Sequence, residues 1–510
     1  MFLTFFSTAK TLLELNHPLK QIQTMTIKDL QPALVFSIFD KINQVPRPSK
    51  KEEKIRKFLL DFAAEHNIDV KTDAIGNVAM FVPATPGKEN APTVVLQAHM
   101  DMVCESNDKN FDFENQPIRT IVDGEWLRAD GTTLGADNGI GMAGAMAALI
   151  DKEIVHGPVQ TLFTVDEETG LTGANNVGDG MITGTILLNL DSEDDAEIFV
   201  GCAGGVDTTC LFTYKRSFAP TDFHYFRFEI SGALGGHSGG DIHLGRANAN
   251  KLLARFLYNL SLEHELSLVE IDGGNLRNAI PRAAHAIVGV HPDHKEAMRV
   301  LLNEYAATIQ QEYSDIEPTM TITMETVERP EYSIDDETAT NIVRAVYSAP
   351  HGVVSMSREL EGLVETSTNL ASVKMKEDNT VVVTTSQRSA VDSRKWDIAN
   401  QVEAHFLLAG AEVVHGEGYP GWKPNLQSPI MEMARDAYKE LYGITPAIKA
   451  IHAGLECGLF LQKYPYLDMV SFGPTLQNVH SPSERMNIPA VDRFYQQLKL
   501  TLKKVADKKA

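Results

Sequence analysis

The chain has 510 residues, of which 43% are hydrophobic and 22% charged, as is typical of a globular protein, and its length allows two large domains. Its formal net charge of -22 argues against binding to nucleic acid or to anionic membranes and suits a cytoplasmic protein. The four cysteines have no paired spacing, so they predict neither a zinc ribbon nor a disulfide framework.

The amino-terminal residues 1–24 are expected to be a peripheral extension. Their apolar start resembles a secretion signal only faintly, because it lacks basic residues at its beginning, Lys10 interrupts it and no clear small-residue cleavage site follows. Met25 is a plausible alternative start, since the first folded helix is predicted from Thr26. No apolar run in the chain reaches the roughly 20 residues of a membrane span.

From residue 26 to about 205, helical and extended patterns alternate, which predicts an α/β domain with a mixed, mostly parallel sheet. The predicted elements are, in chain order, helices 36–42 and 52–66, strands 76–82 and 93–98, helix 141–152, and strands 159–165 and 185–190. The glycine-containing segment 202–205 is interpreted as a hinge, because the sequence pattern changes after it.

The next segment, 206–397, predicts an inserted α+β domain whose strands alternate as strands with one exposed face do. Its predicted elements are strand 222–231, helix 248–260, strand 284–290, helix 294–312, strand 319–327, helix 335–347 and strand 380–387. The first domain is expected to resume from 398 to 510. Its second part has a predicted helix at 431–442, a short buried strand at 469–472 and a terminal helix at 491–506.

Side chains that can bind metal follow three of the predicted strands of the first domain. His99 and Asp101 follow one strand, Glu167 and Glu168 follow another, and Asp191 follows a third. The carboxyl ends of strands are where open α/β sheets place their sites. A single such residue is more often a helix cap or a turn residue, but the recurrence at successive strand ends makes that interpretation improbable.

Asp137, in a glycine-rich turn, and His480, in a polar loop far downstream, complete a set of five ligands for two metal ions. Two cations about 3.5–4 Å apart need a bridging anion, and we expect Asp137 to be the bridge. His99 and Asp191 would complete one metal, and Glu168 and His480 the other. The predicted cofactor is therefore two divalent ions per subunit, Zn²⁺ with Co²⁺ or Mn²⁺ as alternatives.

Two acidic side chains remain beside these ligands and fit the roles that metal-dependent hydrolysis requires. Glu167 would take a proton from a water bridging the metals and pass it to the leaving amine. Asp101 would hold the second ring nitrogen of His99 and so fix its tautomer. The alternative interpretation of Glu167 and Glu168 is a solvated acidic turn. Together with the ligands, the pair predicts a metal-dependent peptidase.

The sequence resembles the dinuclear zinc peptidases that include aminoacylase, carboxypeptidase G and carnosinase, over nearly all of residues 26–505. The motifs that carry the resemblance are LQAHMDMV (96–103), GTTLGADNGIG (131–141), DEETG (166–170), NLDSE (189–193), GGHSGG (235–240), NLRNAIP (275–281), IHAGLECG (451–458) and HSPSE (480–484). The resemblance implies a catalytic α/β domain interrupted by an α+β lid, the same ligand roles, and a cis peptide bond between Asp137 and Asn138. No ligand position is replaced.

The resemblance also assigns roles to residues of the inserted domain. His237 would stabilise the oxyanion of the tetrahedral intermediate, often at the site of a partner subunit. Asn278 and Arg388 would bind substrate, and Arg388 could hold the terminal carboxylate of a dipeptide. An ordinary salt bridge is the alternative for Arg388, and a flexible turn is the alternative for the glycine-rich run around His237.

One further candidate lies in the second part of the catalytic domain. Backbone groups at Gly454 could contact substrate, whereas we expect the nearby Glu456 to be structural.

The resemblance implies hydrolysis of Xaa-His and related dipeptides, such as those of the β-alanyl-histidine type. The enzyme would be a cytoplasmic homodimer that acts on small peptides, with no nucleic-acid or membrane partner. A tripeptidase or an N-acyl amino acid deacylase with the same chemistry is the nearest alternative. A non-hydrolytic metal-binding protein is a more distant one, because such a protein has no need of a base at Glu167 beside a ligand.

Overall fold

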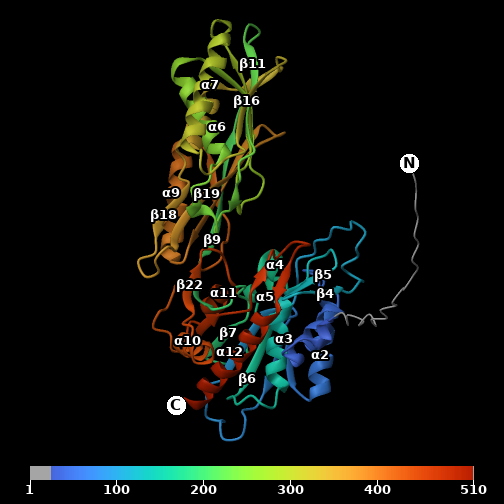
Figure 1. Ribbon diagram of the computed structural model, residues 1–510. Helices are drawn as coiled ribbons and strands as arrows, with labels where there is room; N and C mark the ends of the chain where they lie inside the picture. The colour runs from blue at the N-terminus through green and yellow to red at the C-terminus, as the bar shows by residue number, and fades with distance from the viewer. Residues whose placement is uncertain (1–24, 509–510) are drawn as a thin grey trace, which may run out of the picture.

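An eight-stranded sheet forms the centre of the lower domain in Figure 1, with the strand order β1-β2-β6-β3-β7-β23-β8-β22. Its strands are β1 (Asp69–Thr72), β2 (Val78–Val82), β3 (Val94–His99), β6 (Val159–Thr164), β7 (Ile186–Asn189), β8 (Glu197–Cys202), β22 (Ala447–Ile451) and β23 (Asp468–Ser471). Four of the seven pairings are parallel and three are antiparallel. The prediction of a mixed α/β sheet is confirmed in this computed structural model, which describes residues 25–508.

Both faces of this sheet are covered, which explains why β3 and β6 read as continuous buried runs. The helices whose apolar residues join the larger core are α1 (Ala33–Asn43), α2 (Glu53–His66), α3 (Ala136–Ile150), α10 (Pro429–Tyr442) and α12 (Ile488–Asp507). The opposite face packs against α5 (Thr172–Asn175) and α11 (Glu456–Lys463). Because side chains alternate along a strand, Leu96 and Ala98 enter the first core while Val95 enters the second.

The inserted domain is the upper body in Figure 1 and is built on a nine-stranded sheet whose pairings are all antiparallel. Its strands are β9 (Gly204–Thr213), β11 (His224–Ser231), β13 (Leu266–Gly273), β15 (Ala284–Val290), β16 (Thr321–Val327), β18 (Gly352–Met356), β19 (Val364–Lys376), β20 (Thr380–Ser389) and β21 (Glu412–His415). Its helices are α6 (Ala249–Glu263), α7 (Lys295–Glu312), α8 (Asp336–Ser348) and α9 (Asp392–Leu408). They close a separate hydrophobic core against the sheet.

The boundary expected at residue 398 is wrong, because the chain returns to the first domain only after β21. Helix α9 packs against β9 and β20, and β21 pairs with β9 at the edge of the lid sheet. The apolar spacing of a helix shows that one face is covered but does not show which sheet covers it. The sequence therefore predicts α9 itself better than the domain to which it belongs.

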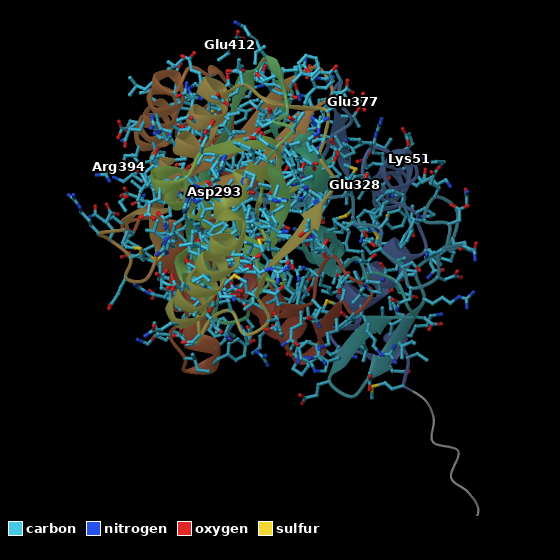
Figure 2. The ribbon with its side chains drawn as sticks, turned by 90° about the horizontal axis from the view of Figure 1, so that it is seen from above. Lys51, Asp293, Glu328, Glu377, Arg394 and Glu412 are labelled. Atoms are coloured by element: carbon cyan, nitrogen blue, oxygen red, sulfur yellow. The ribbon has the colours of Figure 1, made fainter. Side chains whose placement is uncertain are left out.

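The surface carries the acidic excess of the sequence. Figure 2 labels six exposed charged residues: Lys51, Asp293, Glu328, Glu377, Arg394 and Glu412. No helix within residues 25–508 has both the length and the apolarity required to cross a membrane. The predicted extension 1–24 lies outside the described residues.

Candidate metal centre

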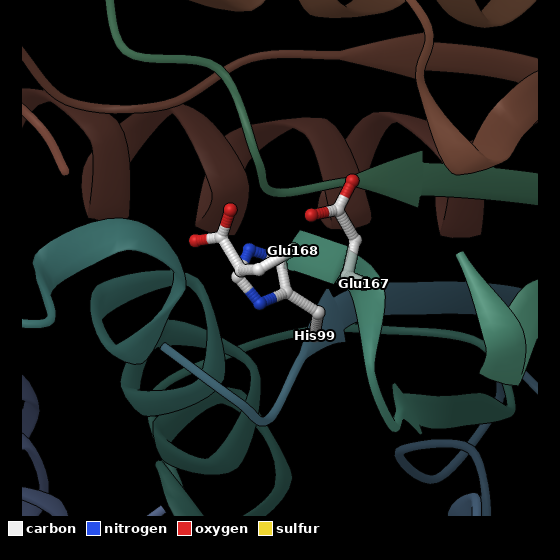
Figure 3. A group of neighbouring side chains, drawn as sticks. All are labelled: His99, Glu167 and Glu168. Atoms are coloured by element: carbon white, nitrogen blue, oxygen red, sulfur yellow. The ribbon is translucent and has the colours of Figure 1, made fainter. Parts of the chain in front are cut away.

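The carboxyl ends of β3, β6 and β7 lie next to one another because these strands are parallel neighbours. His99 is the last residue of β3 and pairs in register with Thr164, the last residue of β6. Glu167 and Glu168 begin the short turn of helix α4 (Glu167–Gly170) just beyond β6. Figure 3 shows their carboxylates diverging, one on either side of the His99 ring in that view. Adjacent acidic residues at this turn thus reach two parts of one site.

Asp137 lies between the two histidines, with one carboxylate oxygen toward each. Its Oδ1 is 3.0 Å from His99 Nε2, and its Oδ2 is 3.1 Å from His480 Nε2. Asp191 Oδ1 lies 3.4 Å from His99 Nε2, and Glu168 Oε2 lies 3.1 Å from His480 Nε2. The five residues therefore form two groups of possible ligands that share Asp137. The bond between Asp137 and the next residue is a cis peptide.

The chemistry of these groups fits two divalent cations. Carboxylates crowd together in a partly buried space, and Glu168 Oε1 has no hydrogen-bond partner among residues 25–508. Burial raises the pKa of Glu168, and burial together with the charges of Asp137 and Asp191 raises the pKa of the neighbouring Glu193 to about 8. Such shifts mark a surplus of negative charge that cations would balance. Imidazole nitrogen and carboxylate oxygen are also the donors that zinc and similar ions accept.

Asp101 holds the acidic turn and lies beside the His99 ring. Its Oδ1 lies 3.4 Å from His99 Nδ1 and accepts the backbone N–H of Glu167 at 3.0 Å. Its Oδ2 accepts the backbone N–H of Glu168 at 3.3 Å and the hydroxyl of Ser49 at 2.8 Å. One buried carboxylate thereby fixes the turn that carries Glu167 and Glu168, and it lies beside the second nitrogen of the His99 imidazole.

Glu167 has the environment of a residue that can accept and release a proton. Burial raises its pKa well above the ordinary value; the His99 ring opposes this shift, and the charges of Asp191, Glu456 and Glu168 add to it. A raised pKa brings a carboxylate closer to neutral pH, where general acid–base catalysis is most effective. The turn that carries it begins at Asp166 in the left-handed region, with φ 49°.

The sequence analysis missed Glu484, which holds the loop that carries Asp137. Its buried carboxylate accepts backbone N–H groups of Leu134, Gly135 and Ala136 at 2.7 to 3.0 Å, and that of Asp137 at 3.4 Å. These N–H groups precede or begin α3, whose amino end has no capping side chain of its own. The first N–H groups of a helix need an acceptor from elsewhere, and this requirement was the available signal.

Arg47 also binds the loop that carries Asp137, and its role was not predicted from the sequence either. Its buried guanidinium donates to the carbonyls of Asp101, at 2.8 Å, and Gly135. Gly135 is thus held by Glu484 through its N–H and by Arg47 through its carbonyl. The two charged groups connect the His99 segment, the Asp137 loop and the His480 loop.

Replacing Glu484 with alanine is expected to destabilise the protein and to lower its metal content. The change leaves buried N–H groups without an acceptor and removes the carboxylate that contributes most to stabilising the charge of the buried Arg47, a kind of loss that costs about 3–5 kcal/mol. Thermal unfolding and elemental analysis measure the two effects, with the exposed Glu328→Gln as control. An unchanged melting temperature and full metal content would show that the loop does not depend on Glu484.

A buried polar network lies beneath the ligands and connects the strands that carry them. Glu456 is 0% exposed, and its Oε2 accepts from Gln97 Nε2 at 2.5 Å and from Thr164 Oγ1 at 2.8 Å. Asn189 Nδ2 donates to Gln97 Oε1 at 2.5 Å. Gln97 and Asn189 each stand two residues before a ligand, so the network sets the spacing of the strand ends. Burial raises the pKa of Glu456 to about 8.

The lid residues form a second cluster, separate from the ligands. His237 lies on β12 (Gly236–His237), which pairs with β14 (Ala279–Ile280) next to Asn278. The N–H of Ser238 donates to the carbonyl of Asn278 at 2.8 Å, and Arg388 Nε donates to Ser238 Oγ at 3.4 Å. Within residues 25–508, no hydrogen bond or ion pair joins His237, Asn278 or Arg388 to the metal-ligand groups.

The ring of His237 is arranged to donate from Nε2. Its Nδ1 accepts the N–H groups of Gly239 at 3.2 Å and Gly240 at 3.0 Å, so this nitrogen carries no proton. Burial lowers the pKa of His237, and the positive charge of Arg388 lowers it further. The neutral ring therefore presents an Nε2–H donor, the group that oxyanion stabilisation requires.

Arg388 is a buried cation that has no carboxylate partner in the described part of the chain. It is 7% exposed, and no ion pair involves its guanidinium among residues 25–508. Its partners are the hydroxyls of Ser238 and Tyr419. The salt-bridge alternative for Arg388 is therefore wrong. A buried guanidinium without an anion indicates a site for an anionic ligand.

Gly454 stands on a loop that reaches both clusters. At one end, His452 Nε2 is 2.7 Å from the hydroxyl of Ser367 on lid strand β19. At the other, Glu456 joins the network beneath the ligands. A Cβ atom at Gly454 would lie 3.0 Å from the ring of Tyr419, so a larger residue would displace this loop or the ring. Gly454 thus lies between the lid cluster and the metal centre.

Comparisons with known proteins agree with this geometry. The model of Peptidase family M20/M25/M40 matches residues 95–504. A cytosol non-specific dipeptidase from Escherichia coli (strain K12) is 41% identical over 483 residues, which are 94% of this chain and 99% of the relative. The structure of an aminoacylhistidine dipeptidase from Vibrio alginolyticus superposes with a TM-score of 0.87 and 44% identity, covering 95% of this chain and 99% of the other. A Staphylococcus aureus tripeptidase, with a TM-score of 0.56 and 16% identity over 94% of this chain and 100% of its own, shares the fold.

Proposed function

The chain belongs to Peptidase family M20/M25/M40, and from that premise we propose that it is a two-metal dipeptidase that cleaves Xaa-His and related dipeptides, including those of the β-alanyl-histidine type. The observation that carries the proposal is the pair of ligand groups sharing Asp137, with the half-buried Glu167 beside them. The similarity to two dipeptidases, one of which is named for aminoacylhistidine substrates, supports the substrate class.

The proposed cofactor is a pair of zinc ions, for which Co²⁺ or Mn²⁺ could substitute at the same donors. His99 and Asp191 would hold one ion, Glu168 and His480 the other, and Asp137 both. When bound, the ions would supply an acidified water and polarise the carbonyl of the scissile bond.

The protein's own groups then move the protons and hold the substrate. Glu167 takes a proton from the attacking water and gives it to the leaving amine. His237 donates its Nε2–H to the oxyanion, and Arg388 binds the terminal carboxylate of the dipeptide. Because the two clusters do not touch in this structure, the lid must close over the metal centre, or the lid of a partner subunit must reach it.

Removing the metals is expected to abolish hydrolysis of β-alanyl-histidine, and zinc, cobalt or manganese should restore it. The test compares that dipeptide with a tripeptide and with an N-acetyl amino acid, and counts ions per chain by elemental analysis. We expect two ions and preferential turnover of the unblocked dipeptide. Faster turnover of the acetylated compound would instead identify a deacylase, and faster turnover of the tripeptide a tripeptidase.

Replacing His237 with alanine is expected to lower kcat about 10²-fold, the scale for losing one oxyanion donor, while metal content stays at the wild-type level.

We propose that the protein is a cytoplasmic homodimer. Mixing two inactive variants tests whether His237 acts in the site of its own subunit or in that of its partner. If a partner's lid completes the site, a mixture of His237→Ala and Glu167→Gln subunits should regain activity that neither variant has. An inactive mixture that still forms dimers would place His237 in the site of its own subunit.

A further inference from the structure

Tyr419 stands where the chain crosses back from the lid to the catalytic domain. Its N–H and carbonyl exchange backbone hydrogen bonds with Gly205 at 2.8 and 3.1 Å. Three residues on, Trp422 pairs in the same way with Cys202 at 2.9 and 2.8 Å. The outgoing and returning segments therefore form a short antiparallel ladder, and Tyr419 belongs to the connection between the domains.

The side chain of Tyr419 has a defined place in this crossing. A Cβ atom at Gly205 would lie 2.8 Å from the tyrosine ring, and one at Gly454 would lie 3.0 Å from it. Both glycines thus leave space that the ring fills. The carbonyl of Tyr419 also accepts a hydrogen bond from the buried Lys395 at 2.8 Å. These contacts fix both the backbone and the ring of Tyr419.

The hydroxyl of Tyr419 accepts a hydrogen bond from Arg388 Nη1 at 2.8 Å, while Arg388 Nε donates to Ser238 on the other side. Ser238 adjoins His237, so one chain of contacts leads from the crossing to both lid residues that face substrate in the proposed function. A hydroxyl orients a guanidinium without neutralising it. A carboxylate in the same place would hold the group equally well but would cancel the charge that an anionic substrate needs.

We propose that Tyr419 is a substrate-positioning residue that acts through Arg388, by holding the guanidinium in the orientation that binds the terminal carboxylate of the dipeptide. This inference rests on the proposed role of Arg388. It also implies that the position of the carboxylate-binding guanidinium depends on the segments that connect the two domains, and not only on the lid sheet.

The experiment compares β-alanyl-histidine with its C-terminal amide in the metal-loaded enzyme carrying Tyr419→Phe. The variant should raise KM for the free dipeptide about fivefold, the scale of one lost hydrogen bond, with kcat within about twofold of wild type. KM for the amide should not change. Tyr225→Phe is the matched control, because it removes a 2.8 Å hydrogen bond from a buried lid tyrosine to the Pro220 carbonyl.

A double-mutant cycle separates this inference from the function on which it rests. Arg388→Gln should raise KM for the free dipeptide more than tenfold and leave the amide little changed, and adding Tyr419→Phe should then have no further effect. If Arg388→Gln affects both substrates equally, the carboxylate role fails and the inference with it. If Arg388→Gln discriminates but Tyr419→Phe behaves like Tyr225→Phe, or still raises KM in the Arg388→Gln background, only the role of Tyr419 is overturned.

Discussion

Replacing Glu167 with glutamine is expected to lower kcat by at least about 10²-fold while both metal ions stay bound. Glutamine has nearly the same shape as glutamate but cannot accept the proton of the attacking water. The five ligands are untouched, and the backbone N–H of residue 167 still donates to Asp101. The loss should therefore appear in turnover and not in metal content or in folding.

Steady-state kinetics and elemental analysis on the same preparation test this expectation. The exposed Glu328→Gln, the same chemical change on the lid surface, serves as control and should match wild type. Near-wild-type turnover by Glu167→Gln with two ions bound would remove Glu167 from the mechanism. Loss of metal as well would show that it contributes to binding the ions.

Replacing Asp137 with alanine is expected to remove both ions and to reduce hydrolysis to background. Its two carboxylate oxygens face different histidines at 3.0 and 3.1 Å, and Asp137 is the residue that both groups of ligands share. Without the bridging charge, two divalent ions would repel each other at close range.

The comparison with Asp191→Ala makes the test specific, because Asp191 contacts only the His99 side of the site. That variant should lose one ion more readily than the other during titration with zinc, whereas Asp137→Ala should lose both together. Asp293→Ala, at an exposed position, controls for the change in net charge. Wild-type protein that holds a single ion at saturating zinc would contradict the shared-ligand arrangement.

The sequence predicts the part of the site at the strand ends because residues able to bind metal directly follow strands that are neighbours in the sheet. His99, Glu167 and Asp191 each follow a short buried run, and parallel neighbours in a sheet bring such positions together. The groups that hold them are harder to predict. Arg47 and Glu484 act mainly on backbone atoms of a distant loop, and no periodicity in the sequence reports such contacts.

Strand β19 is an element of the fold that the sequence does not predict. Its central residues, 366–369, are threonine, serine and asparagine, and serine and asparagine usually mark turns. In the structure they are buried and hydrogen-bonded to other strands: Thr366 to the Ser389 hydroxyl on β20 at 2.9 Å, and Asn369 to the Ala279 carbonyl on β14 at 2.8 Å. Tertiary partners satisfy these polar groups, and the partners lie far away in sequence.

The crossing between the domains has a consequence for how such a protein can diverge. Cys202 and Trp422 are hydrogen-bonded neighbours, so everything between them enters and leaves the catalytic domain at one point. All five candidate metal ligands lie outside that insertion, whereas His237, Asn278 and Arg388 lie inside it. Mutations in the insertion can therefore alter how a peptide is held without touching the candidate metal ligands. Metal binding and substrate contact are inherited on separate stretches of the chain, and each can change with little cost to the other.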